Sequence, residues 1–355
     1  EEKFAQMLEE LEAAEHFIFM EYFIVEEGDM WGGILEILAR KAAQGVDVRV
    51  MYDGACEFAL LPHDYPKRLK ALGIRCKVFA PVSPFISTCY NYRDHRKILV
   101  IDGHTAFNGG VNLADEYVNR KAKFGHWKDT AVMLKGEAVK SFTLMFLQMW
   151  GIDEKKDEYA RFLSYETRPQ KEAKGCVIPY GDSPLDDEKL GERVYMDILN
   201  RSLSYVHIMT PYLILDNEMI TTLTRVAKSG IEAVIIMPHI PDKWYAFAVA
   251  KTYYKELIES GVQIYEYTPG FVHAKTFVVD DKMAVVGTIN MDYRSYYLHY
   301  ECGVWFYRSR VVDELKEDYI KTLALSHEVT IEECANTSLL VKMLRAILNL
   351  FAPML

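Results

Sequence analysis

The sequence predicts an α/β protein of two pseudo-symmetric α/β/α halves, with mixed, mostly parallel sheets and an active site at the interface between the halves. Three observations lead to this prediction. The 355 residues exceed what one simple core usually holds. Strands and helices alternate along each half, and strand–helix–strand units with short joins form parallel pairs. One polar motif also occurs twice, once in each half.

The repeated motif places five residue types at one fixed spacing. One residue separates His from Lys, four residues separate Lys from Asp, and six residues separate Asp from Gly. The Gly begins a Gly-(small)-x-Asn turn, and the Asn ends the motif. A single His-x-Lys carries little information, but two copies that agree at every position do not arise by chance. The matching residues are His95 and His273, Lys97 and Lys275, Asp102 and Asp280, Gly109 and Gly287, and Asn112 and Asn290.

The apolar and charged patterns divide the chain into four segments. We predict an N-terminal half over 1–150, a charged linker over 151–174, a C-terminal half over 175–330 and an amphipathic C-terminal helix over 331–355. A loop over 81–94 leads into the first motif copy. The C-terminal helix has two interpretations: it either docks on the core or lies on a bilayer surface.

Composition limits the classes of binding partner and of cellular compartment that suit this protein. The formal net charge of −10 argues against nucleic acid, which usually binds a basic face. Six cysteines without a CxxC pair favour a reducing compartment. The sequence has no run of about 18 apolar residues, so no transmembrane helix is expected within it, and it has no signal-peptide pattern. Because it opens at Glu1 inside a helical pattern, we expect a longer protein with an upstream membrane anchor.

The residue types of the motif suit chemistry at a phosphate group. His and Lys two positions apart on a strand point to the same face, so the two copies place two imidazoles and two ammonium groups in one cleft. The lysines would bind phosphate oxygens and stabilise charge in the transition state. One imidazole would attack phosphorus while the other protonates the leaving oxygen. Because the lysines replace a divalent cation, we expect no metal and no other cofactor.

Each catalytic imidazole needs an acceptor at its other ring nitrogen. For the C-terminal copy we predict Glu301, which follows Asn290 on an expected strand. For the N-terminal copy we favour Asp129 over Glu116 and Asp115.

The motif aspartates are expected to be structural. From Lys to Asp an extended strand spans roughly 16 Å at about 3.3 Å per residue, so Asp102 and Asp280 do not reach a phosphate that the lysines hold. We predict that they cap turns, and that Gly109 and Gly287 belong to the same structural part of the motif.

Long stretches around both copies match a known pattern over nearly the whole chain. They include NYRDHRK (91–97), FNGGVNLADEY (107–117), WKDT (127–130), PGFVHAK (269–275) and GTINMDYRS (287–295). With the two motif copies, these stretches resemble the phospholipase D superfamily and, within it, the bacterial cardiolipin synthases. One departure is His299, where members of the family usually carry Asn.

The resemblance implies phosphatidyl transfer at a bacterial cell membrane. One His attacks the phosphate of a phosphatidylglycerol, glycerol leaves, and a second phosphatidylglycerol resolves the phosphatidyl-histidine to give cardiolipin. By the same resemblance His95 is the nucleophile and His273 the acid and then the base, although the two copies alone do not fix this order. The alternatives are a phospholipase D or phosphatidylserine synthase with another acceptor and, less well matched, a phosphodiesterase or nuclease.

Other polar residues receive weaker assignments. Substrate-binding roles are predicted for Tyr22, Tyr212, Tyr245 and Arg294. Contacts to anionic headgroups are considered for Lys121, Lys123 and Lys128. No metal-binding spacing is found among His104, His126, His207 and His239, which are expected to be structural.

Overall fold

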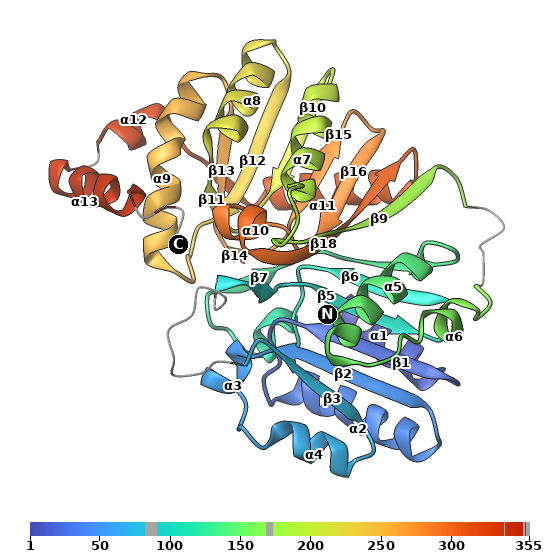
Figure 1. Cartoon of the computed structure of the whole chain (residues 1–355). Coiled ribbons are helices and arrows are strands. Elements are labelled where there is room, and N and C mark those ends of the chain that lie inside the picture. Colours follow the sequence, from blue (N-terminus) through green and yellow to red (C-terminus); the bar gives the residue numbers. More distant parts are fainter. Residues whose placement is uncertain (82–90, 168–172, 337, 351, 353–355) are drawn as a thin grey trace.

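The computed structural model describes residues 1–81, 91–167, 173–336, 338–350 and 352 (Figure 1). Most of the loop predicted over 81–94 and the last three residues of the C-terminal segment lie outside this part of the chain. The two halves are stacked on each other, with the N-terminal half below and the C-terminal half above in this view.

The N-terminal half is one six-stranded sheet with helices on both faces. One face carries α1 (Glu2–Glu12), α2 (Asp29–Ala43) and α4 (Tyr65–Ala71), and the other carries α5 (Val139–Trp150) and α6 (Tyr159–Leu163). A short helix, α3 (Ala55–Ala59), follows the second strand. The strand order is β3 (Arg75–Phe79), β2 (Asp47–Asp53), β1 (Phe17–Tyr22), β5 (Lys97–Ile101), β6 (Thr105–Gly109) and β8 (Ala131–Lys135).

The C-terminal half repeats this plan around a larger sheet. One face carries α7 (Leu190–Arg201), α8 (Asn217–Lys228) and α9 (Trp244–Glu259), and the other carries α11 (Arg310–Leu323). The strand order is β19 (Ser326–Glu328), β13 (Gln263–Tyr267), β12 (Glu232–Pro238), β10 (Tyr205–Met209), β15 (Thr276–Val279), β16 (Met283–Gly287), β18 (His299–Tyr307) and β4 (Arg93–Asp94), with β9 (Cys176–Asp182) also paired to β18.

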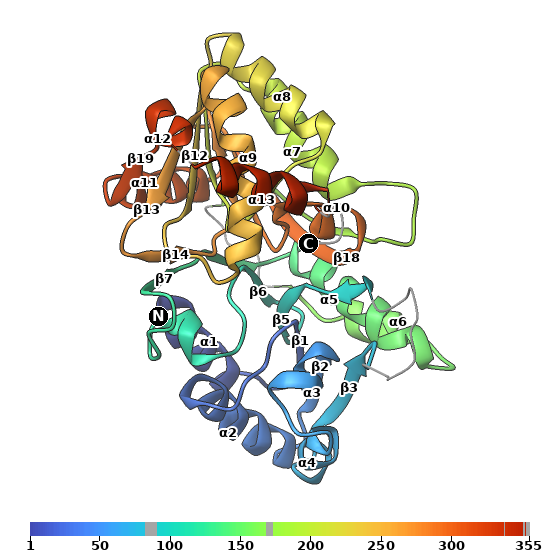
Figure 2. The ribbon, with the colours of Figure 1, turned by 90° about the vertical axis from the view of Figure 1, so that its left-hand side faces the viewer.

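Smaller elements complete the chain. Two short parallel pairs join β11 (Leu213–Ile214) to β17 (Met291–Asp292) and β14 (Gly270–Val272) to β7 (His126–Lys128). Single-turn 3₁₀ helices lie at η2 (Asp115–Val118) and η3 (Gly151–Asp153). The remaining helices are α10 (Tyr293–Tyr297), α12 (Ile331–Ala335) and α13 (Leu339–Asn349), the last of which crosses α9 (Figure 2).

The predicted fold class is confirmed, but the predicted strand directions need a correction. β1 and β2 pair in parallel, as do β10 and β12, so the strand–helix–strand units form as expected. Each motif copy, however, builds a hairpin, β5–β6 or β15–β16, and a tight turn can join only antiparallel strands. Antiparallel pairs therefore outnumber parallel pairs in both large sheets, and the prediction of mostly parallel sheets is wrong.

The two motif aspartates hold the start of each half. Asp102 and Asp280 occupy the hairpin turns with φ of 50° and 54°. Asp102 accepts hydrogen bonds from three consecutive backbone N–H groups before and at the start of β1, at 2.7 to 2.8 Å. Asp280 does the same at the start of β10, at 2.7 to 2.9 Å. These carboxylates join each motif hairpin to the first strand of its sheet.

The two halves share a hydrophobic core. Side chains of β1, β5, β6 and α5 pack in one cluster with side chains of β15, β16, β18 and α11. Phe162 of α6 is buried in this cluster against Phe17 and Phe19, so the segment predicted as a linker over 151–174 is partly folded into the core. The domain boundaries themselves stay predictions. Among the described residues, no helix combines the length and the hydropathy that crossing a bilayer requires.

Candidate active site

A cleft of about 700 Å³ opens between the two halves, beyond the carboxyl ends of β1 and β10. Both motif histidines and both motif asparagines line this cleft, as the repeated motif predicted. The residues around them come from both halves and include Phe23, Tyr117, Trp127, Tyr212 and His299. The motif therefore contributes to one site and not to two.

Backbone pairing across the interface sets the position of each histidine. Just before the first motif copy, β4 pairs in parallel with the start of β18, and His95 donates its N–H to Tyr300 O at 3.0 Å. Just before the second copy, β14 pairs in parallel with β7, and His273 donates its N–H to Lys128 O at 2.7 Å. Each histidine is thus placed beside the residue that precedes a carboxylate of the opposite half.

The histidine–carboxylate pairs consequently cross between the halves. His95 Nδ1 lies 2.8 and 3.0 Å from the two carboxylate oxygens of Glu301. His273 Nδ1 lies 2.7 Å from Asp129 Oδ2. We expected Glu301 to serve the second motif copy and Asp129 the first. The structure brings the four predicted residues together but in the opposite pairing, because the short cross-interface strands bring each histidine next to the other half's acidic residue.

Burial sets the protonation of these pairs. It lowers the pKa of His95 well below its ordinary value, and with the nearby charge of Lys275 it lowers the pKa of His273 to about 4. Burial alone would raise the pKa of Asp129, but His273 and Lys275 lower it to about 2. A neutral imidazole that donates Nδ1–H to an ionised carboxylate satisfies both members of each pair. The Nε2 atom is then left as the lone-pair nitrogen.

The motif lysines lie behind the histidines and are almost fully buried. Lys97 Nζ donates to His95 O at 2.6 Å, and Lys275 Nζ donates to His273 O. Burial lowers the pKa of Lys97 to about 8 and that of Lys275 to about 7. Both lysines therefore titrate near neutral pH, and an anion in the cleft would favour their charged forms.

The motif asparagines differ in how they are held. Asn112 Oδ1 accepts from the N–H of Ile24 at 3.1 Å, and its Nδ2 donates to Tyr117 Oη at 2.8 Å. Asn290 is positioned through its backbone N–H, which donates to Ser295 Oγ at 3.1 Å. The Oδ1 atom of Asn290 is buried and has no hydrogen-bond partner among the residues that the structure describes. The amide of Asn290 is therefore available to a ligand in the cleft.

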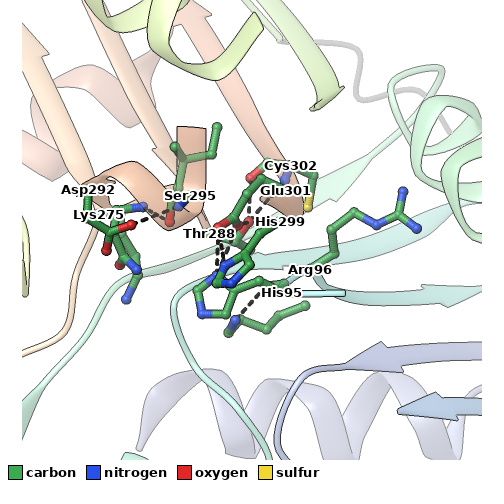
Figure 3. A network of polar contacts seen from close by, with 12 residues as sticks. His95, Arg96, Lys275, Thr288, Asp292, Ser295, His299, Glu301 and Cys302 are labelled. Carbon is green, nitrogen blue, oxygen red and sulfur yellow. Dashed lines mark hydrogen bonds and ion pairs between the residues drawn. The ribbon is translucent and has the colours of Figure 1, made fainter. Parts of the chain in front are cut away.

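The sequence analysis missed the group that holds Glu301. Thr288, read only as the small residue of the motif turn, donates its hydroxyl to Glu301 and accepts the N–H of Cys302 at 3.0 Å (Figure 3). In the first copy the equivalent residue is Gly110, and Asp129 lies directly against it. The different residues at this one motif position could have indicated that the two carboxylates are supported differently.

Aromatic rings surround both imidazoles. The ring of Phe23 lies 5.0 Å from that of His95, while the rings of Trp127 and Tyr117 lie 5.2 and 5.4 Å from that of His273. His299 occupies the place in the second copy that Trp127 has in the first, two residues before the carboxylate, and its ring is 5.4 Å from His95. These rings exclude water from the Nδ1–carboxylate contacts.

The predicted substrate-binding residues have mixed outcomes. Tyr212, Tyr245 and Arg294 line the cleft, and Tyr212 donates its hydroxyl to Asp242 at 2.6 Å. Tyr22 does not line it, because its side chain is buried in the core beneath α1 and α2. Tyr22 pairs with Lys97 in β1–β5, whereas Tyr212 follows the end of β10, so the two tyrosines do not occupy equivalent positions in the two halves.

The remaining polar predictions lie away from the cleft. Ion pairs hold all three loop lysines: Lys121 with Glu26, Lys123 with Glu116, and Lys128 with Asp318. None of the three lines the cleft. The four histidines expected to be structural have separate partners: His104 with Thr105, His126 with Tyr267, His207 with Glu232, and His239 with Glu266.

One group of described side chains has a spacing that could hold a metal ion. Its candidate ligand atoms, on His95, His299 and Glu301, lie within 4.8 Å of one another. Within this group, His95 Nδ1 and Glu301 already form the hydrogen bond that orients the histidine.

Two halves that share one cleft, each with a His-x-Lys motif, define an enzyme of the phospholipase D superfamily. A family profile described as "Cardiolipin synthase, PLD-like domain" matches residues 7–150 and 195–323. The chain belongs to this family, whose members are phosphatidyltransferases.

Relatives with similar sequences support this membership. A protein of Streptococcus mutans described as uncharacterized is 56% identical over 99% of this chain and 76% of its own length. The cardiolipin synthases of Alkalihalophilus pseudofirmus and Halalkalibacterium halodurans are each 35% identical over 100% of this chain and 70% of their own lengths.

Solved structures support the fold. Phosphatidylserine synthase of Haemophilus influenzae superposes with a TM-score of 0.73 over 99% of this chain and 91% of its own, at 14% identity. Polyphosphate kinase of Porphyromonas gingivalis superposes with a TM-score of 0.58 over 93% of this chain and 47% of its own, also at 14% identity.

The contact of Asp129 with Gly110 predicts the effect of adding one methyl group. In Gly110→Ala the new Cβ would lie 2.1 Å from Asp129 Oδ1, so the carboxylate must move away from His273. We expect phosphatidyl transfer to fall by about 10- to 100-fold, because such displacements disrupt proton transfer. The matched control is Gly32→Ala in α2, where no atom lies within 4 Å of the added group. Full activity of Gly110→Ala in a turnover assay would contradict this arrangement.

The lowered lysine pKa values predict how anion binding depends on pH. Sulfate keeps its charge above neutral pH, so its affinity should fall as pH rises through the lysine pKa values of about 7 and 8. The histidines, with pKa values far lower, contribute no change there. Lys275→Met should weaken binding and flatten the pH dependence, while Lys282→Met, at an exposed turn, should match the unmodified protein. Titration calorimetry tests this, and a constant affinity up to pH of about 10 would contradict it.

Proposed function

We propose that this protein is a cardiolipin synthase that transfers a phosphatidyl group between two phosphatidylglycerol molecules. The observation that carries the proposal is the pair of crossed histidine–carboxylate contacts facing one cleft. One of the two histidines can attack a phosphate as nucleophile while the other transfers protons as acid and base, so the reaction needs no further reactant from outside. The relatives described as cardiolipin synthases, which match the whole chain, support the choice of substrate.

The first half-reaction forms a phosphatidyl-histidine. His95 Nε2 attacks phosphorus while Glu301 accepts the Nδ1–H hydrogen bond and stabilises the positive charge that develops on the ring. The bond from phosphorus to the glycerol oxygen breaks, and His273 gives its Nε2 proton to that oxygen. Asp129 and the bound phosphodiester anion both favour the protonated form of His273. Lys97 and Lys275 would neutralise the phosphate oxygens.

The second half-reaction reverses these roles. A hydroxyl of the second phosphatidylglycerol gives its proton to His273 and attacks phosphorus, and the bond to His95 breaks. The products are cardiolipin, free glycerol and the original enzyme. The assignment of His95 as nucleophile follows the family resemblance, since the two pairs are close to equivalent by geometry.

The proposal includes the surroundings in which the enzyme works. Its substrate is an anionic phospholipid, so we place it at the surface of the bacterial cell membrane. Arg93, Lys243 and Arg294 line the cleft and suit an anionic headgroup. With a net charge of −10, we expect no nucleic-acid partner.

Product analysis with phosphatidylglycerol as the only substrate tests the proposed function. We expect cardiolipin and glycerol in equal amounts. His95→Ala and His273→Ala should each lower turnover by about 1,000-fold or more, since each removes a reacting group. His63→Ala is the control, because its side chain is 85% exposed and outside the cleft. Phosphatidic acid as the sole lipid product would indicate water as acceptor, as in a phospholipase D, and would contradict the synthase.

A further inference from the structure

The C-terminal helix α13 has one face packed on the protein. It crosses α9, and Tyr253 of α9 donates its hydroxyl to Asn349 Oδ1 at 3.0 Å (Figure 2). Leu348 packs against the core of the C-terminal half, and Ala352, just beyond the helix, is 3% exposed in that core. The sequence left docking on the core and binding to a bilayer as alternatives for this helix. For this face of α13, docking on the core is the one that holds.

The opposite face of α13 is apolar and exposed. Met343, Ile347 and Leu350 follow one another at helical spacing and are 55%, 53% and 79% exposed. Leu344, three residues before Ile347, extends the same surface. A contiguous apolar surface of this kind usually marks an interaction site.

Apolar side chains of α13 and α9 also lie at the mouth of the cleft. Leu348 lines the cleft from α13, and Trp244, at the start of α9, lines it while remaining 63% exposed. Lys243, which precedes Trp244, is exposed and places its ammonium 5.3 Å from the ring of Tyr212 inside the cleft. Apolar side chains and a cation thus surround the same opening.

We infer that α13 and Trp244 form a docking face that seats the cleft mouth on a lipid bilayer. The docking face consists of Trp244, Met343, Leu344, Ile347 and Leu350. This inference rests on the proposed function, because a lipid substrate must bring its headgroup to His95 while its acyl chains stay in an apolar medium. A face of about one helix length lying in the plane of the membrane is how amphipathic helices bind.

The chemistry of the opening favours a bilayer over a protein partner. Amphipathic helices on membranes place apolar side chains in the acyl region and cations at the headgroup level. Here Lys243 lies next to Trp244, whose ring suits the membrane–water boundary. The helix that carries the apolar face also lines the opening through Leu348, which a distant protein interface would not require.

The test separates binding to a membrane from chemistry in the cleft. We would compare the unmodified chain with the double variant Met343→Glu/Ile347→Glu, whose substituted residues do not line the cleft. The matched control is Leu203→Glu, at an equally exposed site (75%) by the opposite end of β10. Sedimentation with phosphatidylglycerol–phosphatidylethanolamine vesicles measures binding. Turnover is measured on those vesicles and on short-chain phosphatidylglycerol dispersed as monomers.

We expect the double variant to bind vesicles at least about tenfold more weakly and to lose vesicle turnover in proportion. Turnover of the dispersed substrate should stay within about twofold, and Leu203→Glu should match the unmodified chain throughout. Unchanged vesicle binding would overturn the inference, as would an equal loss on dispersed substrate. So would a dimer of the unmodified chain that the variant dissociates without loss of vesicle binding, since a second copy would then cover the face.

These results also distinguish this inference from the proposed function. Vesicle binding is measured without turnover. If the unmodified chain binds vesicles through the docking face but forms no cardiolipin, the proposed function fails while the docking face stands.

Discussion

The active site depends on two hydrogen bonds that cross the interface between the halves. His95 is oriented by Glu301 of the C-terminal half, and His273 by Asp129 of the N-terminal half. Each of these two motif pairs takes its histidine from one half and its carboxylate from the other, so neither half alone orients a motif imidazole. The shared hydrophobic core and the short strand pairs β4–β18 and β14–β7 keep the halves in the one arrangement that completes both pairs. The interactions that hold the two halves together are therefore also the interactions that assemble the site.

Burial has a second consequence, because it sets the charge of the free site. Desolvation lowers the pKa values of both histidines and of both motif lysines, so the empty cleft carries less positive charge than its composition suggests. In the proposed mechanism, a phosphodiester anion favours the protonated forms of the lysines and of the proposed acid, His273. The substrate would thus supply the negative charge that keeps these groups charged, and stabilisation would be greatest where negative charge develops.

Much of this site could be predicted from the sequence, because spacing records which residues share a strand. The positions of both histidines, lysines and asparagines follow from the motif. Glu301 follows from its place on the next strand, whereas Asp129 was favoured among three acidic residues after Asn112. The crossed pairing does not follow, because the backbone pairing of one half with the other leaves no periodic signal. Tyr22 was expected in the substrate-binding cleft because the apolar strands β1 and β10 look alike in sequence. Their register against the neighbouring strands, which buries Tyr22 in the core, cannot be read from that likeness. Thr288 was missed because the motif required only a small residue there.

The fold shows the same division. Local patterns gave the strand–helix–strand units, but the preference for parallel strands ignored the hairpin that each motif copy itself forms. For α13, the sequence left docking and membrane binding as alternatives. In the structure one face of α13 docks on the core of the C-terminal half. The exposed face of Met343, Ile347 and Leu350 is left to bind a membrane.

Long-range ¹H–¹⁵N spectra of the histidine rings test the crossed pairing most directly. Glu301→Gln removes the charge that faces His95, and Asp129→Asn removes the charge that faces His273, with little change in shape. The crossed arrangement predicts that Glu301→Gln shifts the ring nitrogens of His95 and leaves those of His273 unchanged, and that Asp129→Asn does the reverse. Shifts confined to the histidine of the same half would contradict it.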